Sequence, residues 1–256
     1  MKYFNLEKEN GLVIITLNGI KELNLFNWEI LNEFYDILSQ LDKDRDVRII
    51  IITGKGKKAF SAGTDLHVEL KLNESTGKKW SELGHKITRK IETLSVPVFC
   101  VVNGYALGGG MEIVMACDII IASKDAKFGL PEVKYGIIPG WGSISKLSRM
   151  IGKCNAMEII LSGEMIDARD ACKIGLVNRI VENPLEEAKS LARKMLENGP
   201  LSLKFSKKLI NETFYENIEN ALKTESEYFS KCFSTEDQKE GMKSFFEKRK
   251  PKFKGK

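Results

Sequence analysis

Two glycine-containing stretches and two nearby carboxylates are the parts of this sequence best suited to chemistry. FSAGTDL (60–66) breaks at Ala-Gly after a strand-like segment, and a glycine run at 108–110 opens the apolar stretch MEIVMAC. The first N–H groups of a helix have no internal partners, and glycine lacks the Cβ that would keep a ligand away. Such a backbone suits an oxyanion. Considered alone, the break in FSAGTDL is more commonly a plain turn, and tight strand–helix packing explains the glycines at 108–110 equally well.

The two carboxylates follow the glycine run. Glu112 lies in the first turn of the expected helix, and Glu132 follows Pro131 in FGLPEVKYG. Most glutamates are surface residues, and either of these could be one. However, a carboxyl group in apolar surroundings can have a raised pKa and exchange protons near neutral pH. Their proximity to a candidate oxyanion site favours this second interpretation.

Other chemistries find less support. The glycines match neither G-x-G-x-x-G nor G-x-x-x-x-G-K-[ST], so a dinucleotide or ATP site is not expected. GWGSISK (140–146) lacks the second glycine of a G-x-S-x-G elbow. His67 and His85 are the only histidines, which disfavours both a His-rich metal site and a serine triad. We expect no metal and no separate cofactor.

The elements that must position these residues alternate between strands and helices. Asn10-Gly11 predicts a hairpin turn between two strands. Beyond it, apolar runs at 47–53, 97–104 and 118–123 predict buried strands, and 27–41, 76–94 and 107–117 predict helices. This alternation indicates an α/β domain. Asn183-Pro184 marks another helix start, and 200–232 predicts long polar helices. We therefore divide the chain into a core, 1–195, and a C-terminal helical region, 196–256.

Composition limits the class of protein. The net charge of +5 is mild and evenly spread, so it does not indicate a DNA-binding protein. Five cysteines, an odd number without a C-x-x-C pair, are expected to be reduced and mostly to serve packing. No signal peptide and no apolar run of membrane-spanning length is found, so we expect a cytoplasmic protein.

Two longer motifs resemble those of a known family. VNGYALGGGMEIVMACDIIIASKDAKFGLPEVKYGIIPG (102–140) closely resembles the signature of the crotonase family, the enoyl-CoA hydratase/isomerase group. FSAGTDL resembles its second marker, F-[SC]-A-G-x-D-[LIV]. The resemblance runs from NLFN (24–27) to EGMKSFFEKRKPKF (240–253). It implies a crotonase (ClpP-like) fold, in which repeated ββα units form a spiral that is followed by a C-terminal helical trimerisation region.

The resemblance also implies a reaction. The backbone N–H groups of Thr64 and Gly109 would hold the thioester oxygen of an acyl-CoA. Family members that resemble hydratases carry two acids, at the positions of Glu112 and Glu132. The expected activity is syn addition of water to a trans-2-enoyl-CoA, giving a 3-hydroxyacyl-CoA, or the reverse. Glu112 would deprotonate the water and Glu132 would protonate Cα.

Further residues would line the substrate and CoA channel by resemblance. They are Lys21, Leu23, Leu25, Ala62, Asp65, Leu66, His67, Pro139, Gly140 and Trp141. Asp65 could instead only tie down its loop. Leu25 is bulkier than the family's usual residue and would reshape the adenine pocket. Trp141 replaces a small residue, so its ring either shortens the acyl pocket, selects a flat cyclic acyl group, or points outward, which is the commoner role.

Several alternatives remain open at this point. The same scaffold supports double-bond isomerisation, which commonly needs one acid. The basic tail KRKPKFKGK (248–256) could be a solvated end or a nucleic-acid arm, since a few family members bind RNA. We favour a third possibility, that the C-terminal helices cover a neighbour's CoA site and that lysines meet the CoA phosphates. This implies self-association as a trimer or a dimer of trimers, with no nucleic acid and no membrane as partners.

Overall fold

A computed structural model describes residues 1–256. Its main sheet has six strands in the order β1-β2-β3-β5-β7-β10. These strands are β1 (Phe4–Glu9), β2 (Leu12–Leu17), β3 (Ile49–Gly54), β5 (Val98–Val102), β7 (Ile119–Ser123) and β10 (Arg179–Val181). Only β1 is antiparallel to its neighbour. Asn10 and Gly11 both adopt positive φ between β1 and β2, as the predicted hairpin requires.

A second, smaller sheet follows the order β4-β6-β8-β9. Its strands are β4 (Ala59–Ser61), β6 (Tyr105–Leu107), β8 (Lys127–Gly129) and β9 (Ile166–Asp167). The chain passes from β3 to β4, from β5 to β6 and from β7 to β8, so each turn of the spiral leaves one strand in each sheet. A helical segment follows each pair. This is the repeated ββα arrangement that the family resemblance implies.

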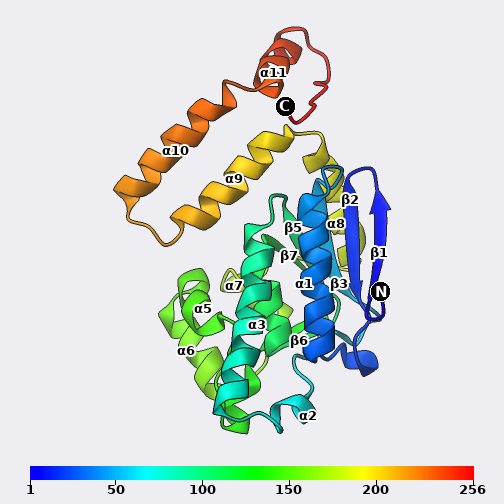
Figure 1. The fold of residues 1–256 in the computed structure, drawn as a ribbon, viewed down its shortest axis with the longest axis vertical. Coiled ribbons are helices and arrows are strands. Elements are labelled where there is room, and N and C mark those ends of the chain that lie inside the picture. The colour runs from blue at the N-terminus through cyan, green and yellow to red at the C-terminus, as the bar shows by residue number, and fades with distance from the viewer.

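Helices cover both faces of the main sheet (Figure 1). On one face lie α1 (Trp28–Lys43) and α3 (Glu74–Thr93), which begin at the caps Asn27 and Asn73. On the other face lies α8 (Pro184–Leu196), whose Ala188 and Ala192 pack with Ile49 and Ile51 of β3. Because the central parallel strands are covered on both faces, every residue of β3 and β5 is buried.

The helix α4 (Gly109–Ala116) is buried along its whole length. It begins directly after β6, so its N-terminus lies at the carboxyl end of a strand of the smaller sheet. The remaining short elements of the core are η1 (Lys21–Leu23), α2 (Leu66–Glu69), η2 (Pro131–Tyr135), α5 (Ser143–Ile151), α6 (Lys153–Ser162) and α7 (Ala168–Lys173). This arrangement carries both glycine-containing stretches and both acids to one side of the core.

The C-terminal helices α9 (Pro200–Thr213), α10 (Ile218–Cys232) and α11 (Glu236–Phe246) extend away from the sheet (Figure 1). No residue of α10 is buried. The basic tail folds back on α11, where the Lys254 and Gly255 N–H groups donate to the Asp237 carboxylate at 2.6 and 2.8 Å. The tail is therefore docked in the monomer and is not a free arm.

The cysteines and the helices bear on two sequence expectations. None of the five thiols forms a disulfide, and Cys100 and Cys117 are buried, but Cys154 is exposed and serves no packing role. None of the helices is long and apolar enough to span a membrane. The division into a core, 1–195, and a C-terminal helical region stays a prediction. The helix α8, which packs on the main sheet, ends at Leu196.

Candidate active site

A cavity of about 690 Å³ lies at the N-terminal end of α4. It brings together many of the residues that the sequence singled out, namely Ala62, Thr64, Leu66, Gly109, Glu112, Glu132, Gly140 and Trp141. Five others do not line it: Leu23, Leu25, Asp65, His67 and Pro139. Lys21 lines a separate depression. The catalytic candidates thus share one space, whereas six of the ten residues expected to line the substrate and CoA channel lie outside it.

Two backbone N–H groups are available at this cavity. The N–H groups of Gly63 and Asp65 donate to Ser61 Oγ and the Phe26 carbonyl, but that of Thr64, between them, has no partner in the protein. Gly109 is the first residue of α4, so its N–H has no intrahelical acceptor. A Cβ on Gly63 would lie 3.2 Å from the Gly109 nitrogen, which shows how closely the two segments approach.

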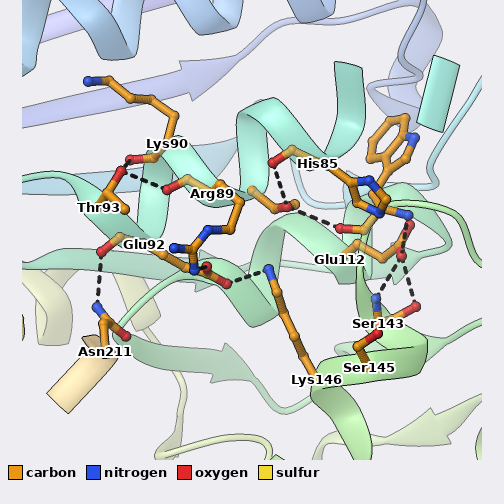
Figure 2. Close-up of polar contacts among 12 residues, drawn as sticks. His85, Arg89, Lys90, Glu92, Thr93, Glu112, Ser143, Ser145, Lys146 and Asn211 are labelled. Atoms are coloured by element: carbon orange, nitrogen blue, oxygen red, sulfur yellow. Dashed lines mark hydrogen bonds and ion pairs between the residues drawn. The ribbon is translucent and has the colours of Figure 1, made fainter. Parts of the chain in front are cut away.

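The carboxylate of Glu112 is held by one of its oxygens. Oε1 accepts hydrogen bonds from the Trp141 N–H at 2.7 Å, the Ser143 N–H at 3.0 Å and the Ser143 hydroxyl at 2.8 Å (Figure 2). The side chain is buried, and burial raises the pKa of Glu112, while these three donors and the Lys146 charge oppose the rise. Burial outweighs these contributions, so the pKa of Glu112 lies above its ordinary value, while the three hydrogen bonds to Oε1 favour the ionised form.

Glu132 has the opposite surroundings. Its Oε2 is buried without a hydrogen-bond partner, and its Oε1 would lie 3.1 Å from a Cβ on Gly108. Burial raises the pKa of Glu132 to about 8, and the charges of Glu112 and Glu69 add to the rise. With a pKa of about 8, Glu132 carries its proton at neutral pH, and its Oε2 has no donor that would favour the ionised form.

Trp141 is buried and does not point outward, contrary to the commoner role considered for it. Its ring contacts Phe26 and Trp80 at centroid distances of 5.9 and 5.6 Å, and Trp80 contacts Trp28 at 4.8 Å. Both Trp80 and Trp141 line the cavity. One wall of the cavity is therefore a fixed aromatic cluster.

The segment around residue 24 serves a structural purpose that the sequence did not predict. Asn24 is buried in a left-handed conformation, and its amide donates to the carbonyls of Ala59 and Phe60 at 3.0 and 3.1 Å. The Leu23 carbonyl accepts from the Ala62 N–H at 2.9 Å. These bonds attach the NLFN segment to FSAGTDL, so Leu23 and Leu25 lie beside the site without entering the cavity.

Other residues bear on the predicted substrate contacts. Asp65 caps α2 by accepting from the His67 N–H at 3.1 Å, which matches the loop-tying alternative for it. The Gly140 carbonyl accepts from the Ser81 hydroxyl at 2.6 Å.

Lys21 lines a depression of about 600 Å³ together with Lys55, Lys57 and Lys58. No group of three or more His, Cys, Asp or Glu side chains is arranged to hold a metal ion.

Three residues of the site were missed by sequence reasoning. Glu69 and Trp80 line the cavity, and Ser143 holds Glu112. Burial raises the pKa of Glu69, while the side chains of Thr64 and Trp80 oppose the rise. Glu69 and Trp80 lie on helices whose inward face is set by packing, so no local pattern distinguishes them.

Comparison with known proteins gives one consistent result. Residues 7–256 match the sequence profile of the family described as Enoyl-CoA hydratase/isomerase. The chain is 44% identical over 247 residues to a "Short-chain-enoyl-CoA hydratase" of Clostridium acetobutylicum, covering 96% of this chain and 95% of that protein. It is 41% identical to a "Crotonyl-CoA hydratase" of Syntrophomonas wolfei subsp. wolfei, with 99% of each chain covered.

Solved structures agree with the sequence relatives. The crystal structure of an enoyl-CoA hydratase from Bacillus anthracis superposes with a TM-score of 0.96 at 34% identity, covering 99% of this chain and all of that one. The spiral fold, the paired acids beside unpaired N–H groups and the full-length matches together place this chain in the enoyl-CoA hydratase/isomerase family.

Proposed function

We propose that this protein hydrates the double bond of a short trans-2-enoyl-CoA to give a 3-hydroxyacyl-CoA, and catalyses the reverse dehydration. The proposal rests on two carboxyl groups that share one cavity with the free Thr64 N–H. Glu112 accepts hydrogen bonds from the protein, whereas Oε2 of Glu132 is buried without a partner. A hydratase must both activate a water and supply a proton, and the two acids suit these two tasks.

The geometry supports one division of roles. The thioester oxygen accepts from the Thr64 and Gly109 N–H groups, which stabilise the enolate charge more strongly than the ground-state carbonyl. Glu112, whose ionised form is favoured by the three donors to Oε1, takes a proton from water as the water oxygen bonds to Cβ. Glu132, held neutral by burial, gives its proton to Cα. After the addition Glu112 holds the proton from water and Glu132 has lost its own, so a proton passes from Glu112 to Glu132, directly or through water, before the next cycle.

The aromatic wall supports a short acyl group. Trp80 and Trp141 close one side of the cavity, and the burial of Trp141 among other rings leaves it little freedom to move aside. The names of the two relatives, short-chain-enoyl-CoA and crotonyl-CoA hydratase, point to the same substrate class. A four-carbon linear enoyl group is therefore the first substrate to test.

Residues outside the cavity suit the binding of the CoA moiety. Lys21, Lys55, Lys57 and Lys58 gather at one depression, and their charges suit the phosphates of CoA. Leu23 and Leu25 lie on the adjoining segment, where the adenine ring would pack. CoA is part of the substrate, so the proposal needs no other cofactor.

Self-association as a trimer or dimer of trimers is also part of the proposal. The C-terminal helices carry large apolar side chains with no cover in the monomer, among them Ile210, Phe229, Phe233, Phe245 and Phe246. Exposed apolar side chains of this size are typical of an interface. The docking of the basic tail on α11 gives less support to our suggestion that its lysines reach CoA phosphates.

The product's mass tests the function directly. Purified protein is incubated with crotonyl-CoA in water enriched in ¹⁸O, and the thioesters are analysed by mass spectrometry. We expect 3-hydroxybutyryl-CoA that carries the label. A product of unchanged mass that separates from crotonyl-CoA by chromatography would instead indicate double-bond isomerisation and would overturn the proposal.

A further inference from the structure

We propose that Ser143 is a positioning residue for the reaction: its hydroxyl fixes Glu112 Oε1, so that Oε2 alone is presented to the attacking water. This inference rests on the proposed function, in which Glu112 is the base. Ser143 has no counterpart in the motifs that predicted the site, and it does not line the cavity itself.

The contact between these residues joins two separate helices. Ser143 is the first residue of α5 and is 1% exposed, and Glu112 lies in the first turn of α4. The only hydrogen bond of the Ser143 hydroxyl is the one to Glu112 Oε1, at 2.8 Å. The donor and acceptor are 31 positions apart in the sequence, so the bond forms only in the folded core.

Glu112 performs for α5 the task that an N-cap side chain performs elsewhere. The N-cap of α5 is Gly142, at φ +114°, which has no side chain to accept from the first-turn N–H groups. The Glu112 carboxylate accepts from the Ser143 N–H at 3.0 Å instead. A carboxylate at a helix N-terminus is further favoured by the helix dipole. The base and the start of α5 therefore hold each other in place.

The consequence is a carboxylate with one occupied and one free oxygen. Oε1 accepts three hydrogen bonds, which use its lone pairs fully, while Oε2 accepts none from the protein. Rotation of the carboxyl group would break all three bonds at once. The Oε2 atom is thus held in one orientation before substrate arrives, which is how a general base reaches a productive geometry.

The surroundings offer no substitute for the hydroxyl. The charged groups that act on Glu112 are Lys146, on α5, and the neighbouring acid Glu132, on η2. Lys146 is engaged by Glu92 of α3 at 2.5 Å, and the Glu92 carbonyl accepts from Asn211 of α9 (Figure 2). Lys146 therefore anchors α5 and does not bond to Glu112 itself. Without the hydroxyl, Oε1 retains only two backbone donors.

The test compares Ser143→Ala and Ser143→Gly, which both remove the hydroxyl, with Ser145→Ala, which changes an exposed serine on the same helix. Kinetics with crotonyl-CoA are measured from pH 5 to 9, and thermal unfolding is measured for each variant. We expect kcat to fall about 10- to 100-fold with little change in KM. We also expect the acid limb of kcat/KM to move upward by about one pH unit, because a donor to the ionised form is lost.

A merely structural role would lower the melting temperature but leave the acid limb in place, and that result would overturn the proposal. So would kcat values within twofold of the wild type in both Ser143 variants. Infrared spectroscopy gives a second readout that needs no turnover. The carboxyl band that is absent from Glu112→Gln belongs to Glu112, and its intensity against pH reports the protonation of that residue. An inactive wild-type protein would therefore refute the proposed function, while the infrared titration would still test the role of Ser143.

Discussion

The Trp141 indole occupies the space that a side chain on Gly84 would fill. A β-carbon on Gly84 would overlap the five-membered ring, and one on Gly109 would overlap the six-membered ring. The indole is therefore seated between α3 and the start of α4 because both helices carry glycine at the contact. This placement fixes the aromatic wall of the cavity, and it makes the size of the acyl pocket depend on Gly84, which does not line the cavity.

Replacing Gly84 should destabilise the fold although alanine favours helices. The added carbon must displace the buried indole, and overpacking of this kind costs about 1–3 kcal/mol. Gly77, on the same helix, is the matched control, because a β-carbon there meets nothing within 4 Å. Gly77→Ala should increase the free energy of unfolding by up to about 1 kcal/mol and so raise the melting temperature. Equal shifts in thermal unfolding for the two variants would contradict this account.

Shortening Trp141 should change which chain lengths the enzyme accepts. Trp141→Ala opens the wall beyond the two acids, so kcat/KM for octenoyl-CoA should rise relative to crotonyl-CoA by roughly 10- to 100-fold. Trp28→Phe is the control, since Trp28 belongs to the same aromatic cluster but does not line the cavity. A ratio that stays the same in Trp141→Ala would show that the ring does not limit the acyl group.

The sequence predicted the long elements of this fold well. Apolar runs such as Ile49–Gly54 and capped helices such as Trp28–Lys43 carry their signals locally. The strands β4, β6, β8 and β9 were not predicted as a second sheet, because two or three residues show no periodicity and pair only with distant partners. Likewise, the donors to Glu112 lie 29 and 31 positions away, and only folding reveals them.

Activity should fall on both sides of neutrality. Glu132 must be protonated to give its proton to Cα, and its pKa is raised to about 8, so kcat/KM for hydration should decline above pH 8. Glu112 must be ionised, so activity should also decline at acid pH. The measurement is kcat/KM for crotonyl-CoA against pH. A rate that stays constant from pH 7 to 10 would show that Glu132 is not the proton donor.

The same raised pKa predicts how stability depends on pH. The folded protein keeps a proton on Glu132 up to about pH 8, whereas the unfolded chain loses it near the ordinary glutamate value of 4.5. This contribution to stability is therefore fully present below pH 4.5 and is lost as pH rises to about 8.

A variant without this titration should behave differently. Glu132→Gln should be more stable than the wild type at pH 9, by on the order of 2 kcal/mol after allowance for partial exposure, and should show little difference at pH 4.5. Chemical denaturation at the two pH values measures the difference. An equal effect at both would mean that Glu132 is not protonated in the folded state.

The rate of crotonyl-CoA hydration by the wild type, Glu112→Gln and Glu132→Gln tests the central claim most directly. The assay follows the loss of the conjugated thioester's absorbance, with circular dichroism to establish folding. We predict rapid loss with the wild type and a fall of roughly 10²- to 10⁴-fold in each variant, because each acid performs its own proton transfer. If either folded variant kept activity within tenfold of the wild type, the two-acid mechanism would be wrong.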